Sequence, residues 1–144
     1  MERLVAKRSG KSYSARNQIL RRMGFASYRS YLESGLWKSI RRRVLVRDRF
    51  LCRLCEAPAV LVHHVNYSWW ALLGRDVACM YSMCVSCHAA VEFEGESKLS
   101  VRQARNRLRK LLRAKSERSD RDNVAAEYLS EQEDELLGLP EGRP

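Results

Sequence analysis

Residues 52–55 read Cys-Arg-Leu-Cys and residues 84–87 read Cys-Val-Ser-Cys, with 28 residues between the two pairs. Each pair can present two thiolates to one tetrahedral Zn²⁺, and four thiolates leave no open coordination position for chemistry. The alternatives are a redox-active cysteine pair, which needs only one such motif, and unrelated surface cysteines. The spacing favours a structural zinc site with the ligands Cys52, Cys55, Cys84 and Cys87.

The three histidines of the chain all lie between or directly beside the two cysteine pairs. His63 and His64 are adjacent, so on a strand their side chains point to opposite faces, and one can bind a metal while the other acts as a base. His88 and Glu92 are four residues apart, which places them on one face of a helix, as in pairs of metal ligands. A purely structural role, as core histidines or as an ordinary helical pair, is the alternative for each.

Apolar periodicity and turn residues indicate the elements around these motifs. Trp37, Ile40, Val44 and Leu45 fall on one face of a helix, and Ser27 can cap a shorter helix before it. We expect helices at residues 15–23, from Ser27, at 36–48, from His88 and at 100–115, a strand at 60–62, and a loop or short helix at 67–75.

Charge is distributed unevenly along the 144 residues, whose net charge is +10. Residues 117–144 carry nine acidic residues against three arginines, a net charge of −6, which leaves +16 on residues 1–116. A body this basic favours a polyanionic partner, and solubility alone is the alternative explanation. Because only 45% of the residues are hydrophobic, we expect a single small core that needs a metal ion for stability.

The same features suggest how the chain is divided. We expect a basic N-terminal arm at residues 1–26 that orders on a partner, one domain at 27–116, and an acidic tail at 117–144 that is mobile or loosely helical. No run of 18 apolar residues and no secretory signal is present, so we expect no membrane contact and a cytoplasmic location. In that reducing compartment, cysteines are metal ligands or redox groups more often than disulfides.

The chain resembles the HNH endonuclease family, in the subset with four zinc-binding cysteines, over about residues 36–93. The resemblance is carried by Trp37, Val44, Arg47-Asp48, the two cysteine pairs, Val62-His63-His64-Val-Asn-Tyr67 and His88. It implies an α+β fold with a small ββα-metal core, also called a His-Me finger, a zinc knuckle and flanking helices. It also implies a metal-dependent enzyme that hydrolyses phosphodiester bonds in DNA, by nicking or by double-strand cleavage.

Residue roles follow from the same resemblance. His64 stands where the family has the general base, and His63 and His88 stand at metal ligands. Glu92 falls where several members have a further histidine ligand, and a carboxylate is a good ligand for Mg²⁺ or Mn²⁺. This division suits phosphodiester hydrolysis, in which a base activates water and a cation neutralises charge on the phosphate and the leaving oxygen.

One position departs from the family pattern. The family usually has Asn or Asp a few residues before the second cysteine pair, and Cys79 stands there by spacing. Cys79 is a soft metal ligand, a buried apolar residue or a sign of weakened catalysis. It therefore favours the alternative function, a non-catalytic zinc-ribbon module that binds nucleic acid or acts as a scaffold.

Two arginine-rich helices are the expected DNA contacts, with a solvated helix face as the alternative. The predicted DNA-binding residues are Arg41, Arg42, Arg43, Arg47, Arg102, Arg105 and Arg109. Trp69 and Trp70 either contact sugar and bases or anchor their loop. A further possibility is that the acidic tail folds over the basic cleft of its own chain as an inhibitor.

Overall fold

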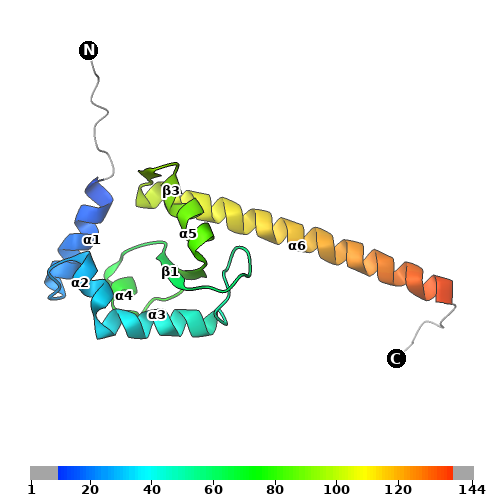
Figure 1. Ribbon diagram of the computed structural model, residues 1–144, viewed down its shortest axis with the longest axis horizontal. Helices are drawn as coiled ribbons and strands as arrows, with labels where there is room; N and C mark the ends of the chain where they lie inside the picture. Colours follow the sequence, from blue (N-terminus) through cyan, green and yellow to red (C-terminus); the bar gives the residue numbers. More distant parts are fainter. Residues whose placement is uncertain (1–9, 138–144) are drawn as a thin grey trace, which may run out of the picture. The chain divides into compact units, whose positions relative to one another are not determined.

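A computed structural model describes residues 10–137 and shows a mixed α+β structure of several helices and two small two-stranded sheets (Figure 1). The helices are α1 (Gly10–Arg22), α2 (Tyr28–Glu33), α3 (Gly35–Arg47), α4 (Trp69–Leu72), α5 (Val85–Glu92) and α6 (Val101–Leu137). The strands are β1 (Leu61–His64), β2 (Met80–Met83), β3 (Phe93–Glu94) and β4 (Ser97–Lys98). Two compact units divide the chain, Met1–Arg109 and Lys110–Pro144, and α6 begins in the first and ends in the second.

The antiparallel pair β1–β2 brings the two cysteine pairs together. His63 lies opposite Tyr81 and His64 opposite Met80 in the register. The first cysteine pair precedes β1 and the second follows β2, so both pairs lie at the same end of the sheet. The sheet lies between α3 and α5 (Figure 1). The strand predicted at 60–62 is present as β1, which begins one residue later and ends two residues later than predicted.

Helix α3 covers one face of the sheet with the predicted apolar side chains, because Trp37, Ile40, Val44 and Leu45 are all buried. Ser34 caps the helix by accepting a hydrogen bond from the backbone of Trp37. At the other end, the Asp48 carboxylate accepts hydrogen bonds from Arg47 and from the backbone N–H of Ser82 in β2. Burial opposes ionisation of Asp48, but these hydrogen bonds hold its pKa below the usual value.

Helices α1 and α2 belong to the same core. The Ser27 capping box confirms the expected helix start, and the Tyr31 hydroxyl donates to the carbonyl of Leu72 over 3.0 Å. Leu20 of α1 is fully buried in this core. Residues 1–26 were expected to form an arm that orders on a partner. In the described part of this segment, α1 instead packs on the domain through the buried Leu20. Residues 1–9 lie outside the described part.

Gly74 ends the turn after α4 in a conformation that glycine favours, with φ of +73°. A Cβ atom there would lie 2.5 Å from Cγ1 of Ile40. The loop can approach α3 this closely only because position 74 has no side chain. The close approach of Gly74 to Ile40 holds the long connection between β1 and β2 against the core.

Helix α6 is much longer than expected. Ser100 and Gln103 cap its start through reciprocal hydrogen bonds, and the helix continues to Leu137, past the predicted end at 115. Residues 116–137 contain no glycine or proline to end the helix. The segment predicted to be mobile or loosely helical is therefore helical as far as Leu137. Within residues 10–137, no helix has the length and apolarity needed to cross a membrane.

Candidate metal centres and the adjoining cleft

Four cysteine sulfurs form one cluster, in which all ligand atoms lie within 4.8 Å of one another. The Sγ atoms of Cys55 and Cys84 are 3.7 Å apart. Two sulfurs bound to one tetrahedral Zn²⁺ at ~2.3 Å are about 3.8 Å apart. The predicted clustering is confirmed, and the four cysteines could hold a metal ion such as zinc.

Backbone turns and hydrogen bonds position the four cysteines. Glu56 adopts a positive φ of 63° directly after Cys55 and so turns the chain back on itself. The backbone N–H of Arg53 donates to the carbonyl of Ser82 and fixes the turn to β2. Cys84 caps α5, and its sulfur accepts a hydrogen bond from the backbone of Cys87. Both pairs are therefore held by hydrogen bonds to neighbouring backbone.

The surroundings shift the pKa values of Cys52 and Cys87 in opposite directions. Burial opposes ionisation of Cys52, but backbone hydrogen bonds at Cys84 and Cys55 lower its pKa to about 7. Burial and the neighbouring sulfurs raise the pKa of Cys87. Four thiolates this close repel one another, so all four ionise together only when a cation compensates their charge.

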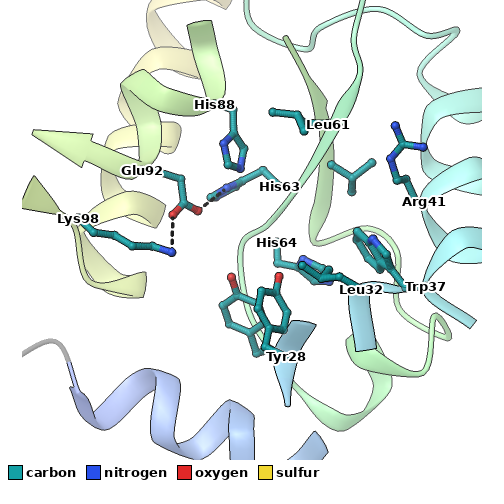
Figure 2. A pocket seen from close by; sticks show the side chains of 12 residues that line it. Tyr28, Leu32, Trp37, Arg41, Leu61, His63, His64, His88, Glu92 and Lys98 are labelled. Carbon is teal, nitrogen blue, oxygen red and sulfur yellow. Dashed lines mark ion pairs between the residues drawn. The ribbon is translucent and has the colours of Figure 1, made fainter. Parts of the chain in front are cut away.

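A second group joins strand β1 to helix α5. Ligand atoms of His63, His88 and Glu92 lie within 4.8 Å of one another, and Figure 2 shows the three side chains pointing toward a common centre. His63 Nδ1 and Glu92 Oε1 are 3.0 Å apart, about the separation of two ligands at right angles on an ion with ~2.1 Å bonds. The residues present therefore fit a small divalent ion.

Burial and protonation also suit this group to a cation. His63 is 2% exposed and Glu92 is 7% exposed. Neither ring nitrogen of His63 has hydrogen-bond geometry with a described residue, despite the short distance to Glu92. Burial lowers the pKa of His88. Burial opposes ionisation of Glu92, but His63 and the charge of Lys98 hold its pKa below the usual value.

His64 faces away from this group, as strand alternation requires (Figure 2). Its ring stacks between Trp37, at 4.7 Å, and Tyr67, at 5.1 Å between centroids. The residue is only 4% exposed, and its Nε2 atom has no hydrogen-bond partner among the described residues. Burial, together with the charges of His63 and Arg16, lowers the pKa of His64 to about 3. The imidazole is therefore neutral at neutral pH.

All three histidines open onto one cleft of about 240 Å³, shown from close by in Figure 2. The cleft is lined by Tyr28, Leu32, Trp37, Arg41, Leu61, Val62, His63, His64, Tyr67, His88, Glu92 and Lys98. Tyr67 belongs to the stretch that carries the resemblance but had no predicted role of its own, and Lys98 lies outside that stretch. The three predicted ligands and the predicted base are thus brought to one cavity.

Cys79 does not line this cleft. Its thiol donates to the carbonyl of Asp76 over 3.4 Å, and its side chain is half-buried against the hydrophobic core. Burial raises the pKa of this thiol, which disfavours the thiolate that would bind a metal. Of the three interpretations of Cys79, packing is the one that the structure supports.

Three of the four arginines of α3 have structural partners that the sequence did not indicate. Arg43 donates to the carbonyl of Gly74, and Arg41 donates to the carbonyl of Val60. Arg47 pairs with Asp48 and also donates to the carbonyls of Val77, before β2, and of Met80, the first residue of β2. Each bond uses only part of a guanidinium, and Arg43 and Arg47 are exposed while Arg41 lines the cleft, so the expected phosphate contacts stay predictions.

The remaining predicted DNA contacts differ in their surroundings. Arg42 and Arg109 are exposed. Arg102 and Arg105 line a second cavity together with Arg16, a residue to which the sequence assigned no role. Both neighbouring tryptophans, Trp69 and Trp70, are exposed, so neither is a buried anchor of its loop.

Comparisons with protein-family models, with curated proteins and with solved structures found no match to this chain.

Proposed function

We propose that this chain is a metal-dependent endonuclease that hydrolyses phosphodiester bonds in DNA, with β1, β2 and α5 as a ββα-metal unit. The observation that carries the proposal is the convergence of His63, His88 and Glu92 beside His64 in one cleft. A divalent ion such as Mg²⁺ or Mn²⁺ held there would neutralise charge on the phosphate and on the leaving oxygen. The cysteine cluster would hold a structural Zn²⁺.

The residues of the chain supply the remaining parts of the reaction. A water molecule attacks phosphorus, the His64 imidazole accepts its proton, and the bond from phosphorus to the leaving oxygen breaks. His64 is neutral at neutral pH and so can accept this proton. Stacking between Trp37 and Tyr67 fixes the ring plane, and Arg41 supplies a cation at the cleft for a neighbouring phosphate.

The test is cleavage of supercoiled plasmid by the zinc-loaded chain with Mg²⁺, with Mn²⁺ or with EDTA. We expect cleavage with the divalent ions only, and we expect His64→Ala to lower the rate by about 10²- to 10⁴-fold. Zinc content and circular dichroism, both unchanged, show that the variant is folded. A His64→Ala variant that cuts as fast as the parent would remove the base assignment.

One observation favours the alternative, a non-catalytic nucleic-acid-binding or scaffold module. His64 is 4% exposed and has a pKa of about 3, which makes it a weak base unless substrate binding changes its surroundings. The same experiment separates the two functions. Retarded but uncut plasmid under all metal conditions would favour the binding module.

A further inference from the structure

Helix α1, the segment after β1 and the first turns of α6 line a second cavity of about 270 Å³ that is open to solvent. Three arginines, Arg16, Arg102 and Arg105, line it together with Asn66, and no acidic residue does. We propose that this cavity is a phosphate-binding subsite that takes one backbone phosphate of the DNA, outside the cleft of the three histidines. The choice of DNA rests on the proposed function, whereas the oxyanion chemistry rests on the cavity itself.

Two contacts fix α1 beside this cavity. The Tyr13 hydroxyl of α1 donates to the carbonyl of Leu99, just before α6, over 3.3 Å. Leu20, further along α1, is fully buried in the core. Helix α1 is therefore held at both ends, and Arg16 lies between these two contacts.

Arg16 is a buried cation without an acidic partner. The residue is 9% exposed, and its Cζ atom lies 3.7 Å from the ring centroid of Tyr28 and 5.3 Å from that of Tyr67. Its Nε and Nη2 both donate to one neutral oxygen, Oδ1 of Asn17. Aromatic rings and an amide orient a guanidinium but do not neutralise it. A buried charge of this kind is stabilised when an anion joins it.

Arg105 has a buried hydrogen-bond donor that lacks an acceptor in the described part of the chain, which is independent support for an anion site. Its Nε atom is buried and has no hydrogen-bond partner among the described residues. Among the side chains that the structure describes, no acidic group forms an ion pair with Arg16, Arg102 or Arg105. A buried donor without an acceptor is destabilising. A phosphate oxyanion offers several acceptors and suits the planar fork of a guanidinium.

Tyr67 connects this cavity with the cleft, because it lines both. Its ring stacks on His64, and the guanidinium of Arg16 lies over the same ring. A DNA strand that enters the cleft can therefore place another of its phosphates in the arginine cavity. Such a contact would fix the strand without reading its sequence.

Binding of a short fluorescein-labelled duplex tests the proposal, measured by anisotropy over a range of NaCl concentrations. The full zinc-loaded chain is used without Mg²⁺ or Mn²⁺, so that no cleavage occurs. We expect Arg105→Gln to weaken binding about tenfold and to lower the slope of log K against log salt by about 1. The matched control is Arg21→Gln, which removes an equal charge from an exposed position on α1 and changes affinity less than about twofold. Equal effects of the two variants would overturn the subsite in favour of diffuse attraction.

A second measurement separates this inference from the nuclease proposal. Inorganic phosphate is titrated into the ¹⁵N-labelled chain against NaCl of the same ionic strength, and the Arg105 Nε–Hε signal is followed. A saturable shift with phosphate alone supports the oxyanion site, even if the plasmid assay shows no cleavage. If that shift occurs but the duplex does not bind, the DNA assignment is overturned. A signal that responds equally to phosphate and chloride overturns the site itself.

Discussion

The cysteine cluster and the group of His63, His88 and Glu92 lie along the same two strands and the helix that follows them, yet they differ in donors and surroundings. The cluster has four thiols, which complete a tetrahedral shell. The second group has three nitrogen and oxygen donors, lines a cleft and lies beside His64, whose Nε2 has no hydrogen-bond partner among the described residues. Four sulfur ligands complete the coordination of an ion and suit a structural role. Three nitrogen and oxygen ligands beside a cavity leave coordination positions open and suit an ion that also contacts a substrate.

The largest expected effect concerns the cluster. Structural zinc contributes on the order of 10 kcal/mol to folding in small zinc domains. We therefore expect Cys52→Ser to lose zinc and its cooperative unfolding transition, as measured by metal content and by tryptophan fluorescence in urea. Cys79→Ser makes the same chemical change outside the cluster, and should keep its zinc and lose about 1 kcal/mol. Equal zinc contents in the two variants would contradict the assignment of the cluster.

A smaller effect is expected in the second group. Glu92→Gln removes the only carboxylate of that group, and we expect Mn²⁺ to bind at least about tenfold more weakly. Zinc content should stay at that of the parent chain. The control is Glu94→Gln, because Glu94 is exposed and pairs with Arg107 instead. Free Mn²⁺ measured by electron paramagnetic resonance checks both variants, and similar losses would mean that the three donors do not act as one site.

The smallest effect comes from a cation at the edge of the second group. Lys98 Nζ lies 3.6 Å from Glu92 Oε2, and the lysine side chain is 50% exposed. Solvent screens such a pair, so we expect Lys98→Met to strengthen Mn²⁺ binding only about two- to threefold. Lys38→Met, at an exposed position on α3, should leave Mn²⁺ affinity unchanged. Weaker Mn²⁺ binding after Lys98→Met would show that the lysine supports the site rather than competing with the ion.

The sequence predicted most of the elements that depend on local patterns. The face of α3 that carries Trp37 and Ile40, the cap at Ser27 and the clustering of the cysteines are all confirmed. The predicted helix end at residue 115 was wrong: charge composition suggested a mobile or loosely helical tail, whereas the lack of glycine and proline lets α6 continue to Leu137. Local propensity was the better guide for this segment than net charge.

The sequence was a weaker guide to the partners and surroundings of the arginines. The run at 41–43 predicted a phosphate-binding surface, which stays a prediction, and it did not indicate that Arg43 also donates to a carbonyl of the loop that Gly74 brings close. Arg16 had no distinctive neighbours in sequence, and its cavity exists because helices far apart in the chain meet around it. Whether an arginine faces solvent, a carbonyl or an empty cavity depends on distant segments.

The sequence by itself determined the donors: which side chains can ligate an ion, how the cysteines are spaced, and which helix faces are apolar. These properties depend on residue chemistry and on the periods of helices and strands. Only the tertiary structure decided that His63 meets His88 and Glu92, that aromatic rings enclose His64, and that three arginines share a cavity. Such meetings depend on strand register and packing between segments far apart in the chain, which local periodicity does not specify.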